Sequence, residues 1–147
     1  MNTRIILLLM TAGLAACSGG GKGPAATPAP GPDGATPTPV SIDEDRSDGL
    51  AGSDADGNGI RDDIDRLIAS QFSARPDIRA AAEQKARALR QMLLATTREE
   101  ALAAGRQIAR ASSCVYRILP FDQPGAVPVR DAMSREIESL TANTRVR

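Results

Sequence analysis

The sequence contains no histidine and no tryptophan, and its 147 residues include only three aromatic side chains, Phe72, Tyr116 and Phe121. The absence of histidine excludes histidine general bases, Ser-His-Asp and Cys-His nucleophilic sites, and metals held by histidine. Two cysteines are too few for a four-cysteine zinc or iron–sulfur site within one chain. So few rings also argue against a base-stacking surface, and we expect no nucleic-acid partner.

An apolar run near the N-terminus has the pattern of a secretory signal peptide. Arg4 is the only charged side chain before the run from Ile5 to Ala16. A helix of this length is too short to cross a hydrocarbon core of about 30 Å. The residues that end the run, Leu14-Ala15-Ala16-Cys17, resemble the lipobox of bacterial lipoproteins.

That resemblance implies diacylglyceryl transfer to Cys17, cleavage before it, and acylation of the new amino terminus. Several acyl chains exceed what stable membrane anchoring requires. In such lipoproteins an aspartate after the cysteine usually causes retention in the inner membrane. Ser18 therefore favours the outer membrane, with the protein facing the periplasm. An ordinary signal peptide cut near Ala16, or an uncleaved hydrophobic anchor, stays open as an alternative.

Beyond the signal peptide (residues 1–16) the composition predicts three further segments. Residues 17–41 carry Cys17 and a stretch with six glycines and six prolines, which predicts a disordered tether spanning roughly 25–30 Å. Residues 42–65 hold nine acidic residues against two arginines, a net charge of −7. Residues 66–147 hold fourteen basic and eight acidic residues, a net charge of +6. Blocks of one sign are typical of ion-binding or partner-binding surfaces, although the two blocks could simply attract each other.

The acidic segment contains one motif of defined chemistry, Asp54-Ala55-Asp56-Gly57-Asn58-Gly59-Ile60-Arg61-Asp62-Asp63-Ile64-Asp65. Its oxygen donors follow the spacing of an EF-hand loop, with Gly59 at the sixth position for the sharp turn. The side chain of Ile60 is then expected to pack against the following helix. The candidate metal ligands are Asp54, Asp56, Asn58, the carbonyl of Ile60, Asp62 and Asp65. Such a set suits Ca²⁺, which takes six to eight oxygens. The same spacing is compatible with a plain acidic linker that caps a helix.

The loop departs from an EF-hand in two respects. Its last ligand is aspartate instead of glutamate, and residues 47–53 contain too many helix breakers to form an entering helix. In this form it resembles the calcium loops of thrombospondin type 3 repeats and of dockerins. The resemblance covers about twelve residues and implies calcium binding, not cell adhesion or cellulosome assembly. A single loop with a short final ligand predicts weak affinity, about 10⁻⁴–10⁻³ M. Residues 43–49 could be a decayed second loop.

The remainder predicts an all-α fold, a small bundle of about four short helices. The first helix is expected to begin with Asp62, Asp63 and Asp65 in its first turn, where negative charge suits the helix dipole. The second is expected from about Asp77 to Ala95, the third after a Thr97 cap, and the fourth from about Val129 to Thr141. Apolar residues recur in each at helical spacing. Residues 120–128 hold three prolines and predict a loop. For the third helix, the spacing predicts an apolar face made of Leu102, Gly105, Ile108, Ala109, Ser112, Val115, Tyr116 and Leu119.

Two features of the third helix could mediate interactions. Arg106, Arg110 and Arg117 form a basic stripe that could meet lipid phosphates, an acidic protein or the chain's own acidic loop, or could simply be solvated. Cys114 falls beside this stripe on a helical wheel. If Cys17 is lipidated, Cys114 is the remaining thiol, and it could form an intermolecular disulfide or serve as a small apolar residue beneath the fourth helix.

These observations predict a non-enzymatic, calcium-binding lipoprotein that presents a helical domain to a partner protein in the cell envelope. Two other functions stay open. The first is an enzyme accessory or metal-dependent hydrolase that uses the acidic loop. The second is a purely structural lipoprotein whose acidic linker binds nothing. The sequence favours a non-enzyme because it offers no general base other than carboxylates and no glycine-rich phosphate loop.

Overall fold

A computed structural model describes residues 41–146 and confirms the all-α expectation for that part of the chain. Its helices are α1 (Asp62–Gln71), α2 (Pro76–Leu94), α3 (Arg98–Ile118) and α4 (Ala126–Thr141), and residues 41–146 contain no strand. The predicted signal peptide, Cys17 and the tether up to residue 40 lie outside the described residues. None of the described helices is both long enough and apolar enough to span a bilayer.

Local sequence explains where each helix begins. Three aspartates in the first turn of α1 favour its positive dipole end, and Pro76 occupies the first turn of α2, where no N–H is needed. Thr97 and Glu100 form a reciprocal capping box at the start of α3. α4 begins at Ala126, earlier than the predicted Val129, because Gly125 turns the chain at φ 77° and Pro128 is tolerated in the first turn.

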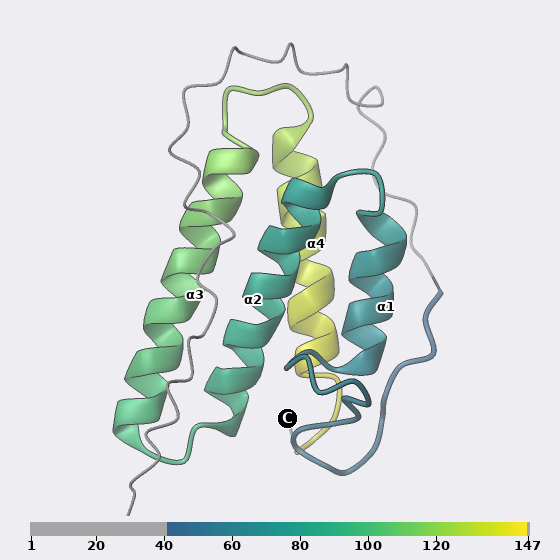
Figure 1. The fold of residues 1–147 in the computed structure, drawn as a ribbon, viewed down its shortest axis with the longest axis vertical. Coiled ribbons are helices and arrows are strands. Elements are labelled where there is room, and N and C mark those ends of the chain that lie inside the picture. Colours follow the sequence, from purple (N-terminus) through teal and green to yellow (C-terminus); the bar gives the residue numbers. More distant parts are fainter. Residues whose placement is uncertain (1–40, 147) are drawn as a thin grey trace, which may run out of the picture.

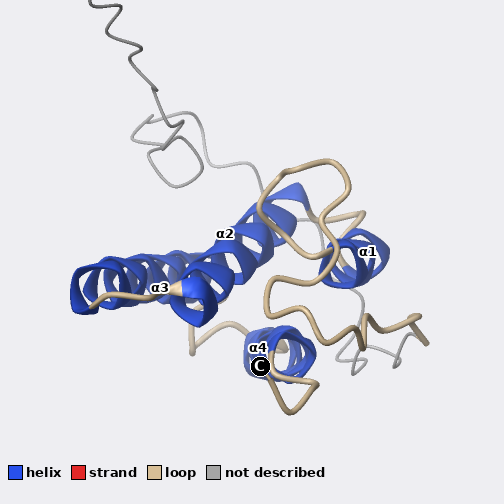
Figure 2. Ribbon diagram, turned by 90° about the horizontal axis from the view of Figure 1, so that it is seen from below, coloured by secondary structure: helices blue, strands red, loops and turns tan. Residues whose placement is uncertain are grey.

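The helices pack around α2, which contacts α3, α4 and α1 (Figure 1). The largest fully buried side chains come from the loop end, α1 and α4: Ile60, Ile68, Met133 and Ile137. α2 and α3 both bury small residues: Ala81, Ala82, Ala86 and Ala88 on α2, and Ala104 and Ala111 on α3. Seen along the helices, α3 lies at the outer edge of the bundle (Figure 2).

The structure corrects part of the apolar face predicted for α3. Leu102 and Tyr116 are exposed, whereas Val115 and Leu119 are buried as predicted. Ala104, Ala111 and Cys114, which were not predicted on that face, are buried as well. Cys114 is part of the core, as expected for a small apolar residue.

Candidate metal centre

The acidic loop brings together three of its predicted ligands. One carboxylate oxygen from each of Asp54, Asp56 and Asp62 lies within 4.8 Å of the other two. Two oxygens bound to one Ca²⁺ are at most about 5 Å apart, since each lies 2.3–2.6 Å from the ion. The three carboxylates can therefore reach the same cation.

Backbone geometry holds these side chains in place. Asp56 Oδ1 accepts a hydrogen bond from the Asn58 N–H at 3.1 Å, and Asn58 Oδ1 accepts one from the Ile60 N–H at 2.8 Å. These are two successive turns in which a side chain bonds the backbone two residues on. Gly57 and Gly59 both have positive φ, of 68° and 83°, which confirms the prediction that Gly59 permits the sharp turn.

Asp54 is largely buried. Its side chain is 10% exposed. Oδ2 accepts a hydrogen bond from the Gly59 N–H at 3.2 Å and lies 3.4 Å from Nη2 of Arg90 on α2. Oδ1 is buried and has no hydrogen-bond partner among the described residues. An ionised oxygen without a partner is costly to bury, and a bound cation would remove that cost.

Asp62 closes the loop onto α1. Its Oδ2 accepts a hydrogen bond from the Ser53 hydroxyl at 2.6 Å, and its Oδ1 accepts one from the Ala55 N–H at 2.9 Å. These bonds, the Ser53 bond first, lower the pKa of Asp62 below its ordinary value. The carboxylate is therefore ionised at neutral pH, as a metal ligand must be.

The remaining predicted ligands are placed differently. The Asn58 side chain donates a hydrogen bond to the Asp56 carboxylate, and its amide oxygen accepts one from the Ile60 N–H. Ile60 is buried in the core, as expected for a residue that packs on the following helix. Asp65 lies within the first turn of α1 and is not one of the three clustered carboxylates.

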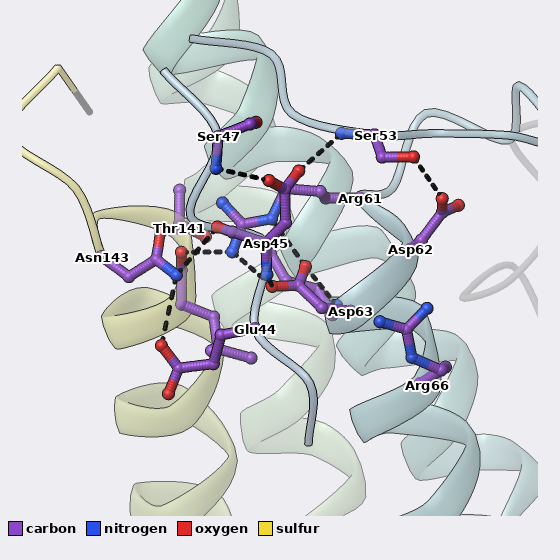
Figure 3. Close-up of polar contacts among 12 residues, drawn as sticks. Glu44, Asp45, Ser47, Ser53, Arg61, Asp62, Asp63, Arg66, Thr141 and Asn143 are labelled. Carbon is purple, nitrogen blue, oxygen red and sulfur yellow. Dashed lines mark hydrogen bonds and ion pairs between the residues drawn. The ribbon is translucent and has the colours of Figure 1, made fainter. Parts of the chain in front are cut away.

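A buried ion pair that the sequence did not reveal lies where the loop joins α1. Arg61 Nε donates to Asp63 Oδ1 at 2.6 Å, and Arg61 Nη2 donates to Asp63 Oδ2 at 2.8 Å. The guanidinium also donates to the Leu140 carbonyl at 2.6 Å, which joins the loop to the end of α4 (Figure 3). Arg61 is 3% exposed and Asp63 is 0% exposed. The sequence suggested only a dipole interaction for Asp63, because no pattern indicates which acid of an acidic run is buried.

Asp45 fixes the segment that precedes the loop. Its N–H donates to Asp63 Oδ2 at 2.8 Å, and its carboxylate accepts from the Ser47 and Ser53 N–H groups at 2.9 and 2.7 Å (Figure 3). Its carbonyl also accepts from Asn143 Nδ2 at 3.1 Å. Both carboxylate oxygens of Asp45 thus bond backbone N–H groups, which gives this residue of the possible second loop a structural role.

A cleft of about 530 Å³ lies where the loop meets α2 and α3. Its lining comprises loop residues 57–59, residues of and just after α2 (Arg87, Arg90, Gln91, Leu94 and Ala95), and Glu100, Ala103 and Ala104 of α3. The one carboxylate in this lining, Glu100, accepts hydrogen bonds from the Thr96 and Thr97 N–H groups at the start of α3. Glu100 thus has a structural role as part of the capping box.

Comparison with known proteins gives no family assignment. No protein-family model matches the chain, and no curated protein and no solved structure matches it significantly. The residues themselves define a helical domain with an acidic loop that could hold a metal ion.

Proposed function

We propose that this chain is a calcium-binding lipoprotein of the cell envelope, anchored by Cys17 and without enzymatic activity. The observation that carries the calcium proposal is the buried, unpartnered Oδ1 of Asp54 beside the carboxylates of Asp56 and Asp62. Carboxylate, amide and carbonyl oxygens in one loop suit Ca²⁺, whereas Mg²⁺ usually retains several waters. The residues that would hold the ion are Asp54, Asp56, Asn58, the Ile60 carbonyl and Asp62, with Asp65 in the first turn of α1 as the remaining candidate.

The ion would link the loop to the helical domain. Asp62 begins α1, and Ile60 is in the core, so a cation shared by the loop residues would hold both in place. Ligands that bind only the folded state stabilise it by mass action. The role we propose for calcium is thus to stabilise a domain that meets a partner protein in the envelope, most simply on the periplasmic face of the outer membrane.

Calorimetric titration of the full chain with Ca²⁺ tests the metal site. We expect one site with a dissociation constant of about 10⁻⁴–10⁻³ M and weaker binding of Mg²⁺. At about ten times the dissociation constant, calcium should stabilise the fold by about 1.4 kcal/mol, a rise in melting temperature of roughly 6–11 °C. The Asp54→Asn, Asp56→Asn double variant should lose both effects, because asparagine keeps an acceptor oxygen for the loop but removes the charges.

A charge-matched control separates the site from general electrostatics. Asp122 and Asp131 are exposed and lie outside the loop, so their replacement by asparagine should leave the titration unchanged. Absence of heat and of any melting shift with the wild-type chain would refute the calcium proposal. Equal binding by both double variants would refute the assignment to this loop.

The anchor is tested separately. In a bacterial host, the wild-type chain should incorporate a labelled fatty acid and sediment with outer-membrane fractions, and Cys17→Ser should lose the label. Labelling that persists in the Cys17→Ser variant would show that Cys17 is not the acylation site.

A further inference from the structure

The outer face of α3 is divided lengthwise into an apolar edge and a basic edge. With about 100° per residue, the exposed positions between 102 and 117 span roughly 120° of the helix. The apolar edge is formed by Leu102, Ala109 and Tyr116, and the basic edge by Arg106, Arg110 and Arg117. Leu102 is 51% exposed and Tyr116 is 46% exposed, so both large side chains on this edge face the solvent.

The three arginines of the basic edge are not neutralised by the fold. No ion pair joins them to any carboxylate in residues 41–146, and the only acids on α3 are Glu99 and Glu100 in its first turn. On α2, by contrast, Glu83 lies 2.9 Å from Arg79 and 3.5 Å from Arg87. Most of the acidic segment lies beside α1 and α4, across α2 from α3 (Figures 1 and 2). The outer face of α3 therefore presents positive charge to the surroundings.

An ordered aromatic pair completes the apolar edge at the end of α3. The rings of Tyr116 and Phe121 stack with centroids 5.2 Å apart, and Phe121 is 71% exposed. The guanidinium of Arg130, buried beneath them, lies 4.7 Å from the Tyr116 ring and 4.2 Å from the Phe121 ring. Arg130 also donates to the Leu119 carbonyl at 3.3 Å. The pair is thus held outward by a fixed cation–π contact and does not fold back onto the core.

We infer that the outer face of α3 lies against an anionic phospholipid surface. An exposed helix about 30 Å long, with apolar side chains along one edge and arginines along the other, has the pattern of an interfacial helix. Aromatic rings are favoured at the bilayer interface, and guanidinium groups pair with phosphate oxygens. A flat surface also fits this face, because none of its apolar or basic residues lines the cleft. The proposed anchor would keep a membrane within reach, although the inference requires neither it nor the metal site.

The chain offers a direct optical test because it contains no tryptophan. Phe121→Trp in the full chain places a single reporter at the aromatic end of the face. With vesicles of phosphatidylcholine and phosphatidylglycerol, we expect a blue shift of the emission and quenching by lipids brominated in their acyl chains. With phosphatidylcholine alone, both effects should be much weaker. A second chain with Val146→Trp, an exposed site beyond α4, should show neither effect.

The arginines are tested in the Phe121→Trp background. Each basic residue near an anionic surface contributes about fivefold to partitioning, so Arg106→Gln, Arg110→Gln and Arg117→Gln together should weaken it on the order of a hundredfold. The control replaces the exposed Arg46, Arg135 and Arg145, which lie off α3, and should have a much smaller effect. Circular dichroism confirms that each variant is folded.

Three outcomes would overturn the inference. The first is the absence of a shift with anionic vesicles, which would leave the face available to an acidic protein instead. The second is an equal shift with both vesicle compositions that the α3 substitutions do not reduce. The third is an equal shift from the Val146→Trp reporter, which would mean that the membrane does not select this face.

Discussion

Removal of the Asp63 carboxylate should strongly destabilise the protein, because the change leaves a buried guanidinium without its counter-ion. In the native fold, Asp63 accepts two hydrogen bonds from Arg61 and one each from the Asp45 and Ile64 N–H groups, at 2.6–2.8 Å. After Asp63→Ala, Arg61 keeps only the Leu140 carbonyl as a partner. Loss of one partner of a buried ion pair costs about 3–5 kcal/mol. A domain of this size is stable by about 5–15 kcal/mol, so a large part of its stability is at stake.

Urea denaturation of the full chain, followed by far-ultraviolet circular dichroism, measures this cost. The companion double variant, Asp63→Ala with Arg61→Met, removes both charges and should recover most of the lost stability. Arg79→Ala serves as the control, since its exposed pair with Glu83 is worth about 0.3–0.5 kcal/mol. A cost below about 1 kcal/mol for Asp63→Ala would refute the reasoning. So would a double variant whose loss equals the sum of the two single losses.

Other parts of the loop give further predictions. Gly52→Ala should cost about 2–3 kcal/mol by urea denaturation, since φ is 66° and a β-carbon would lie 2.2 Å from a side-chain carbon. Gly57→Ala, with φ of 68° and no neighbouring atoms within 4 Å, should cost only about 1 kcal/mol, and equal costs would contradict the steric argument. Arg90→Gln should raise calcium affinity roughly tenfold in calorimetry, because it removes a positive charge 3.4 Å from Asp54 Oδ2. Unchanged or weaker binding would contradict it. The folded-state pKa of Asp62 is lowered, so the unfolded state takes up the proton first and stability should fall as pH drops below about 4. Asp62→Asn should flatten this part of the pH profile of urea stability, and an unchanged slope would argue against the Asp62 hydrogen bonds as its source.

Several features were predictable from the sequence because their causes are local. The helix class followed from the spacing of apolar residues, and the start of α3 followed from Thr97 as its cap. The turn at Gly59 and the burial of Ile60 followed from the loop motif. Each depends on residues a few positions apart, so no knowledge of distant contacts was needed.

Other features depended on contacts between distant segments. The spacing of the loop motif predicted both Asp54 and Asp65 as metal ligands. The structure groups Asp54 with Asp56 and Asp62, whereas Asp65 lies in the first turn of α1 and outside this group. The apolar face predicted for α3 was only partly right: Val115 and Leu119 are buried, but Leu102 and Tyr116 are exposed, because the neighbouring helices decide which side of α3 is covered.

By itself, then, the sequence determined the helices, their caps, the tight turn of the acidic loop and the set of oxygen donors from which a metal site could be built. Only the tertiary structure decided which acid became the buried partner of Arg61, which carboxylate kept an unpartnered oxygen, and which side of α3 faced outward. The physical reason is that helix formation and turn geometry are set by neighbours along the chain. Burial and charge pairing are set by whatever the rest of the fold brings alongside, here α2 and the end of α4.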